Sequence, residues 1–122
     1  MAKNYQQEGK VLSFTNSTGS DIAAGDVVVM GAVLAVALSD IVDGESGSVQ
    51  TQEVFIVPKV SGAVIAQGED LTWDVSAAAF DDNQATPATG DITGAAAFAA
   101  EAAGAGVTTI AVRFTGVPGT VN

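Results

Sequence analysis

The residues that most often do chemistry in proteins are missing from this chain of 122 residues, which contains no histidine and no cysteine. Histidine is the usual general acid or base near neutral pH and a frequent metal ligand, and cysteine supplies thiol nucleophiles. Their absence excludes Ser-His-Asp and Cys-His catalytic arrangements, cysteine metal sites and disulfides. The 14 carboxylates remain. So many acids pair by chance that a two-carboxylate glycosidase, the enzyme alternative, has no specific support. We predict no catalytic residues.

One acidic segment holds oxygen ligands of the kind that calcium prefers. Asp81, Asp82 and Asn83 stand together, and Asp91 follows later. Calcium sites need several such oxygens, but the spacing of an EF-hand loop is not kept here. A solvated acidic loop is the better interpretation, and it also fits the acidic loop at residues 39–47. We therefore predict neither a metal site nor a cofactor.

Two short motifs are also weak. The glycine-rich residues 104–109 lack the lysine and the glycine spacing of a phosphate-binding loop, so they predict a turn. Residues 16–18 match the glycosylation sequon but, without a signal peptide, indicate only a turn.

Trp73 is the only tryptophan of the chain, and Arg113 is its only arginine. Trp73 beside Asp74 could stack on a sugar, but a core or interface tryptophan is the more common case. Arg113 stands inside an apolar strand, where its forked head suits an acid across a sheet or a subunit boundary. We place both residues at a subunit interface, with a surface ion pair as the equal alternative for Arg113.

The elements that must position these residues are short strands separated by turns. Apolar alternation and β-branched residues predict strands at residues 10–15, 27–30, 33–38, 48–52, 53–60, 71–75 and 107–114. Pro58 should end its strand or place it on a sheet edge, and residues 107–114 should form a central strand. Strands at this spacing predict an all-β fold, a small β-barrel or β-sandwich of short antiparallel strands.

Two of the turns are nearly the same. Residues 22–26 and 65–70 each run from an isoleucine through a short bend to glycine and an acid, and a strand follows. Glycine supplies the positive φ of a tight turn, and an acid beside it is typical of turns. We predict that Gly25 and Asp26, and likewise Gly68 and Glu69, are structural and chemically silent.

The remaining segments set the expected boundaries. Polar residues 1–10 form an extended N-terminal arm, residues 11–115 the β-domain, and residues 116–122 a short tail. Residues 80–93 read as a long surface excursion. The alanine-rich residues 94–104 have helical propensity, but the β-rich context favours a strand for their first half.

Composition limits the partners. The net charge of −10 disfavours nucleic acid and anionic membranes, and it favours a partner with positive patches. Hydrophobic residues make up 48% of the chain but aromatic residues only 6%, so the core layers should be thin. The N-terminus lacks the apolar core of a signal peptide, so we expect synthesis in a reducing cytoplasm.

Several short pieces of the chain stand in an order and spacing typical of one family: residues 2–5, 25–29, 36–38, 54–59, 68–74, 93–96 and 112–114. Through these pieces the chain resembles the capsid cement (decoration) proteins of tailed bacteriophages. Members of this family are often mislabelled as RecA-like recombinases, but this chain lacks a phosphate-binding loop and a basic patch.

The resemblance implies a non-enzymatic, β-rich homotrimer on the outside of the phage head. It would bind the major capsid protein in the virion, after synthesis in the bacterial host, without small-molecule substrate, nucleic acid or membrane. For the capsid contact we select the arm residues Ala2, Lys3, Asn4, Tyr5, Gln6 and Gln7, because an extended arm can add to a neighbour as a strand. Another structural virion component, such as a tail- or fibre-associated β-domain, is the alternative.

Overall fold

The computed structural model describes residues 3–4 and 6–122, and these form strands and no helix. The strands in chain order are β1 (Val11–Thr15), β2 (Val27–Met30), β3 (Val33–Ala37), β4 (Ser46–Gln50), β5 (Gln52–Pro58), β6 (Thr72–Asp74), β7 (Ala79–Asp81), β8 (Ile92–Thr93), β9 (Ala97–Ala99), β10 (Thr109–Thr115) and β11 (Thr120–Val121). The prediction of an all-β fold is confirmed.

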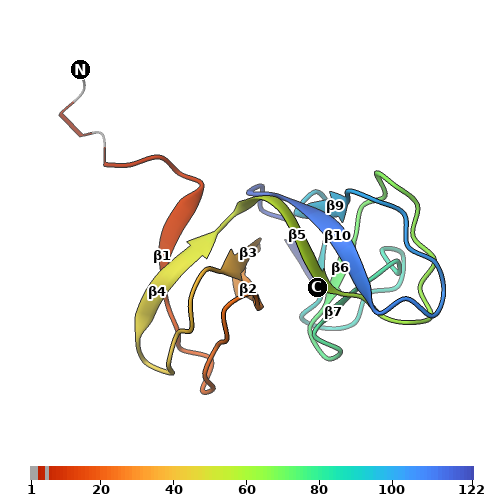
Figure 1. The fold of residues 1–122 in the computed structure, drawn as a ribbon, viewed down its shortest axis with the longest axis horizontal. Helices are drawn as coiled ribbons and strands as arrows, with labels where there is room; N and C mark the ends of the chain where they lie inside the picture. Colours follow the sequence, from red (N-terminus) through yellow and green to blue (C-terminus); the bar gives the residue numbers. More distant parts are fainter. Residues whose placement is uncertain (1–2, 5) are drawn as a thin grey trace.

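The strands form three antiparallel sheets. The first has the order β1-β4-β3-β2, the second β5-β10-β9 and the third β11-β8-β6-β7. In Figure 1 the first sheet lies on the left and the other two lie together on the right. Strand β4 continues through Thr51 into β5, so one extended stretch of chain passes from the first sheet into the second.

The second sheet is built as its sequence pattern predicts. Strand β10 alternates between buried and less buried residues, and it lies between β5 and β9, which makes it central. Ile110, Val112 and Phe114 point into the core because side chains alternate along a strand. Strand β5 ends at Pro58 and also forms an edge of its sheet, as a proline without a backbone donor requires.

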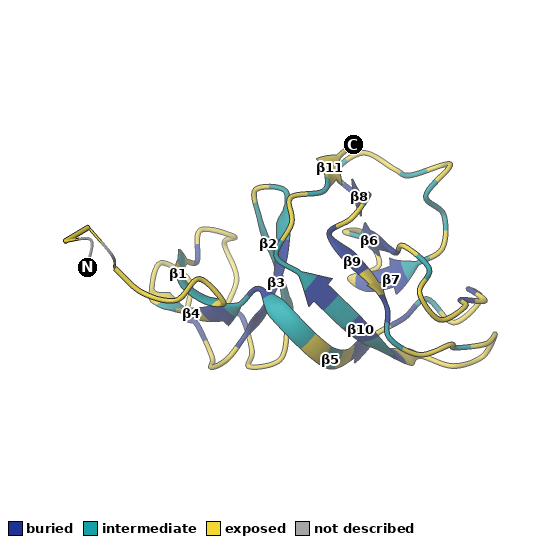
Figure 2. Ribbon diagram, turned by 90° about the horizontal axis from the view of Figure 1, so that it is seen from above, coloured by how far each residue is buried: buried dark blue, intermediate teal, exposed yellow. Residues whose placement is uncertain are grey.

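Two hydrophobic cores hold the fold together. The larger one joins the second and third sheets and also takes in Leu34 and Val36 of β3, and among the described residues it contains the fully buried aromatic rings. Phe80 stands at its centre, with its ring 4.9 Å from Trp73 and 5.8 Å from Phe114, both edge to face. The smaller core lies on the first sheet and is aliphatic, with Ile41 and Val49 fully buried. Figure 2 shows these buried strands in dark blue.

The structure corrects the interpretation of residues 80–93 as a surface excursion. Both ends are core: Phe80 and Ile92 are fully buried and belong to β7 and β8. The acids, the proline and the glycine between these two residues are typical of loops. They indicated a loop for the whole segment, although a short strand lies at each end. The first half of the alanine-rich segment is a strand, β9, as preferred. Residues 116–122 contain β11, which pairs with β8, so this segment is part of a sheet.

Candidate functional site

The turn at residues 23–26 is closed entirely by backbone and carboxylate bonds. The amide of Asp26 donates to the carbonyl of Ala23 (3.0 Å), and Gly25 has a φ of 90°. This combination matches a type II turn, in which the third position favours glycine. The Gly25 amide donates to the carbonyl of Ala37 on β3 (2.8 Å), and the Ala37 amide returns a bond to Asp26 (2.9 Å).

The turn at residues 66–69 repeats this arrangement in the other half of the molecule. The Glu69 amide donates to Ala66 (3.2 Å), Gly68 has a φ of 85°, and Gly68 and Glu69 exchange backbone bonds with Ala99. In both turns the acidic side chain accepts the amide of the first residue, at 3.0 Å for Asp26 and 3.1 Å for Glu69. These acids therefore brace the turns.

Two further copies were missed by the sequence interpretation. Residues 42–45 exchange the same two backbone bonds with Asn16, and residues 88–91 exchange them with Asn122. Both segments were assigned to acidic loops, although each ends in glycine followed by an acid. That dipeptide is the sequence signal that would have found them. Asn16 is fully buried here, and its side chain forms hydrogen bonds with Ser20, Ile41 and Thr18. The asparagine of the sequon therefore stabilises a turn, as the sequence predicted.

The acidic segment around Asp81 does not assemble a metal site. Asp91 is fully buried, and its carboxylate accepts the amides of Val75 (3.2 Å) and Ala88 (3.0 Å). Desolvation by burial raises the pKa of Asp81. By contrast, hydrogen bonds from the Ser76 hydroxyl and the Ala77 amide lower the pKa of Asp74. Within residues 3–4 and 6–122, no group of three acids is placed to hold a metal ion.

The glycine-rich turn at residues 104–107 encloses a buried lysine. The ammonium group of Lys59 donates to the carbonyls of Val60 (2.9 Å), Gly104 (3.1 Å) and Val107 (3.1 Å), and the residue is 3% exposed. Burial of a charged group requires such partners. The segment that superficially suggested a phosphate loop thus uses its carbonyls to bind the chain's own cation.

The structure separates the two residues predicted at a subunit interface. Trp73 packs in the larger core and is 6% exposed, so little of its surface is left to meet a second subunit. Arg113 lies on the outer face of the second sheet with its side chain 35% exposed. Its Nη1 atom is 3.6 Å from Oε2 of Glu53.

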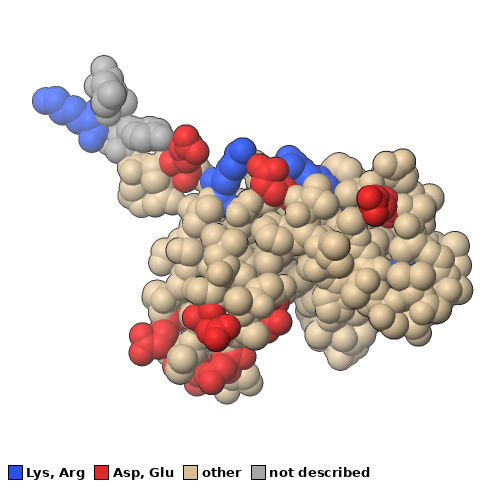
Figure 3. All heavy atoms as spheres, viewed as in Figure 1, with Lys and Arg blue, Asp and Glu red and all other residues tan. Residues whose placement is uncertain are grey.

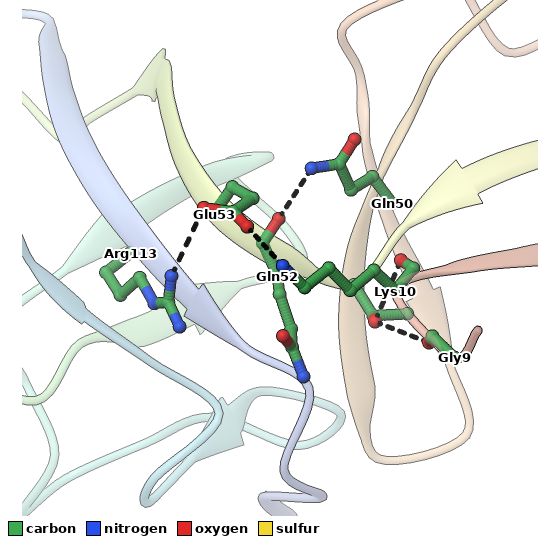
Figure 4. Close-up of polar contacts among 7 residues, drawn as sticks. Gly9, Lys10, Gln50, Gln52, Glu53 and Arg113 are labelled. Atoms are coloured by element: carbon green, nitrogen blue, oxygen red, sulfur yellow. Dashed lines mark hydrogen bonds and ion pairs between the residues drawn. The ribbon is translucent and has the colours of Figure 1, made fainter.

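Glu53 links Arg113 to the root of the N-terminal arm (Figure 4). Its Oε1 atom accepts a bond from the Lys10 ammonium (3.1 Å), and that bond is the main cause of its lowered pKa. Next to it, the Thr51 amide and hydroxyl donate to the carbonyl of Lys10. Lys10 at the arm root, Glu53 on β5 and Arg113 on β10 thus converge beside Thr51, where β4 passes into β5.

Glu53 has a backbone conformation that residues other than glycine rarely adopt. Its φ is 89°, and the register places it opposite Phe114, a core residue. A left-handed φ of this kind costs about 1–3 kcal/mol and persists only where its surroundings enforce it. In ordinary strand geometry a residue opposite Phe114 would share its inward face. The unusual φ lets the carboxylate reach Lys10 and Arg113 on the outside instead.

The arm itself is exposed. Of the residues selected for the capsid contact, Lys3, Asn4, Gln6 and Gln7 are exposed, whereas Ala2 and Tyr5 lie outside the described residues. The Gln7 side-chain amide donates to the carbonyl of Val11 (2.6 Å), which ties the last part of the arm to β1. Figure 1 shows this segment leading away from the sheets.

Charge is unevenly distributed over the surface. Five exposed acids gather in the turns at one end of the first sheet: Asp21, Asp26, Asp40, Asp43 and Glu45. Figure 3 shows them as the red group at the lower left, while the blue side chains follow the upper edge from the arm inward. Several of these acids accept backbone amides, such as that of Gly19 at Asp43 (3.1 Å). None of the described residues forms a helix able to cross a membrane.

The described residues form a β-domain with an exposed arm whose root lies in the ion-pair cluster of Lys10, Glu53 and Arg113. The family model of the phage cement proteins matches residues 6–114. The chain belongs to this family, which is structural and non-enzymatic and whose place is the capsid of the virion. No curated protein and no solved structure is similar enough to count as a match.

Proposed function

We propose that the chain binds the outside of the assembled phage head as a homotrimer and links neighbouring subunits of the major capsid protein. The observation that carries this proposal is the exposed arm, which leaves the body at Lys10 and continues from the edge strand β1. An extended polar segment of this kind suits strand addition to a neighbouring sheet, in which main-chain hydrogen bonds supply the affinity.

The root of the arm supports this role. Lys10 is held by Thr51 through its carbonyl and by Glu53 through its ammonium group. A fixed root limits the directions that the arm can take, and this lowers the entropy lost when the arm binds. A homotrimer would carry three arms, and linked arms can exceed the affinity of one arm by about 10²–10⁴-fold.

Binding of this kind stabilises the shell by mass action. A ligand that binds the assembled form and not the dissociated form favours the assembled form. No reactive group is needed, and the acids of the turns are used for bracing rather than chemistry. The family membership favours the head over a tail or fibre position, and cryo-electron microscopy of virions would show where the density lies.

The test compares the full chain with an arm variant on expanded capsids. Residues 1–7 are removed, so that Lys10 and its contacts with Thr51 and Glu53 remain. The full chain should decorate the capsids and raise their disruption temperature, and the shortened chain should keep its fold, as measured by circular dichroism, but bind poorly.

A second variant separates arm length from arm sequence. It replaces residues 1–7 by glycine and serine at equal length. Weak binding by this variant would assign recognition to the arm side chains, and full binding would assign it to the backbone. Normal decoration by the shortened chain would refute the role of the arm, and failure of the full chain to bind heads would refute the cement function.

A further inference from the structure

The outer face of the second sheet carries large apolar side chains that the other described residues leave exposed. Val54 and Ile56 on β5 are 52% and 76% exposed, and Phe98 on β9 is 36% exposed. An antiparallel sheet with one face on the core normally presents polar residues on the other face. In Figure 2 the exposed residues of β5 interrupt the otherwise buried and half-buried strands.

These side chains form one continuous surface. The strand register places Ile56 opposite Ala111, Val54 opposite Arg113, and Arg113 opposite Phe98. Residues directly opposite on one face are neighbours. We call Val54, Ile56, Phe98, Ala111 and Arg113 the sheet face. Beside it runs a shallow groove of about 310 Å³, which Ile56, Val107 and Ala111 help to line.

The charge pattern favours a second copy of this chain as the occupant. Two copies with a net charge of −10 repel one another over most of their surfaces. Among the described residues, the exposed cations are Lys3 and Lys10 on the arm and Arg113 on the sheet face, since Lys59 is buried. Five exposed acids gather instead in the turns of the first sheet, whereas the acids beside the sheet face include Glu53, which is paired with Arg113 and Lys10, and Glu101 at the groove. Repulsion between copies is therefore weaker at the sheet face than at those turns.

Arg113, the cation on the sheet face, already has a partner of opposite charge within its own chain. Burying a charge without a partner is costly, and the cost falls when the partner is in place beforehand. Arg113 is paired with Glu53 of its own chain, and Glu53 is fixed by Lys10 as well. A second copy can therefore cover Arg113 without supplying a carboxylate of its own.

We infer that the sheet face is one side of the contact between copies of this chain. This inference rests on the homotrimer in the proposed function and does not depend on the contact between arm and capsid. A closed ring of three copies uses a heterologous contact, in which one patch meets a different patch of the next copy. The sheet face supplies the apolar patch of such a contact, with Ile56 as its most exposed large side chain.

The test is the mass of the protein in solution, measured by light scattering over a range of concentrations. The wild-type chain, with a monomer mass of 12.1 kDa, should associate. Ile56→Glu should weaken the association by about 30-fold or more, because it introduces an unpaired charge at the centre of the contact. Val121→Glu is the matched control: it makes the same change at a side chain that is 55% exposed, on β11 of another sheet.

Salt gives a second readout. A contact between apolar faces of like-charged copies should strengthen as added salt screens their repulsion. If Ile56→Glu does not fold, Ile56→Ser makes the same test without a charge. Association that survives both substitutions would overturn the inference and leave the homotrimer intact.

The capsid assay distinguishes the other outcomes. A wild-type chain that stays monomeric in solution overturns the inference, and whether it still decorates heads decides the cement function independently. If the Ile56 variants leave the mass unchanged but abolish decoration, the sheet face binds the capsid instead, and the inference is likewise wrong.

Discussion

The two halves of the molecule use the same turn and different cores. In the first half, the turn at residues 23–26 exchanges bonds with Ala37, and Ile22 pairs with Ile41. In the second half, the turn at residues 66–69 exchanges the same bonds with Ala99, and Ile65 pairs with Ala103 in the same way.

The difference lies in the chain between each turn and its partner. The first half returns through the short hairpin β2–β3, whereas the second inserts β6, β7 and β8 before it reaches β9. That insertion brings Phe80 into contact with both Trp73 and Phe114, so the second half has an aromatic core and the first an aliphatic one. The turn chemistry can be reused because it needs only local bonds, whereas the stability of each half depends on what the connecting chain buries.

The largest expected effect tests whether the larger core contributes more to the free energy of unfolding than the smaller core. Phe80→Ala should cost about 3–5 kcal/mol of unfolding free energy, because it empties the centre of the larger core. Phe14→Ala makes the same change beside the smaller core, where Phe14 is only partly buried, and should cost clearly less. Urea unfolding of both variants measures the difference. Equal losses would show that the halves contribute equally to stability.

The next effect concerns the buried cation of the second half. Lys59→Met keeps the apolar stem but leaves three carbonyls without their donor, at about 1–3 kcal/mol for each carbonyl that is shielded from water and finds no new partner. Lys10→Met is the control, because Lys10 is exposed and its loss should change the unfolding free energy little. Similar unfolding midpoints for the two variants would mean that water replaces the ammonium group of Lys59.

A smaller effect tests whether the two turns are equivalent. Gly25→Ala and Gly68→Ala force an ordinary residue into a positive φ, at about 1–3 kcal/mol each. A Cβ atom meets nothing within 4 Å at either position, so the loss should be nearly the same in both turns. Gly62→Ala has equal space and no positive φ, so thermal unfolding should show no loss. A marked difference in stability loss between Gly25→Ala and Gly68→Ala would mean that the two turns share their hydrogen bonds but not their backbone strain.

The smallest effects are pH-dependent and have opposite signs within the second half. The pKa of Asp74 is lowered, so its carboxylate stabilises the fold above the usual value of 3.8, and this is lost as the pH falls through the lower folded pKa. The pKa of Asp81 is raised, so its charge destabilises the fold at neutral pH, and this cost disappears as the pH falls below 3.8.

Substitution of these two acids separates their contributions. At pH 7 Asp74→Asn should lower the thermal unfolding temperature and Asp81→Asn should raise it. Both differences should shrink as the pH falls below 3.8, because the carboxyls then become protonated in the unfolded and, at lower pH still for Asp74, in the folded state. Shifts of the same sign at pH 7 would contradict the assignment.

Much of the fold was predictable because it depends on local chemistry. Alternation along residues 107–114 predicted the central strand, which is β10 (Thr109–Thr115), and Pro58 predicted the end of β5. The glycine–acid pairs at Gly25 and Gly68 predicted two of the turns. The copies at Gly44 and Gly90 were equally visible but were assigned to solvated loops, because many acids in a segment also indicate solvation.

Of the candidate site, the sequence indicated the polar arm and an ion pair at Arg113. It did not indicate that the two are connected. Nothing in the order of residues relates Lys10 to Glu53, which stand far apart in the chain and meet because β1 and β4 pair and β4 continues into β5. The positive φ of Glu53 was equally hidden, because a glutamate gives no sign of adopting it.

By itself, then, the sequence determined the longer strands, the turns at Gly25 and Gly68 and the absence of histidine and cysteine chemistry, since propensity and composition act over a few residues. Only the tertiary structure decided which apolar residues point inward. Trp73 went to the core, and Ile56 was left on the outside. The physical reason is that strand alternation defines two faces, but only the packing of the sheets decides which face is covered.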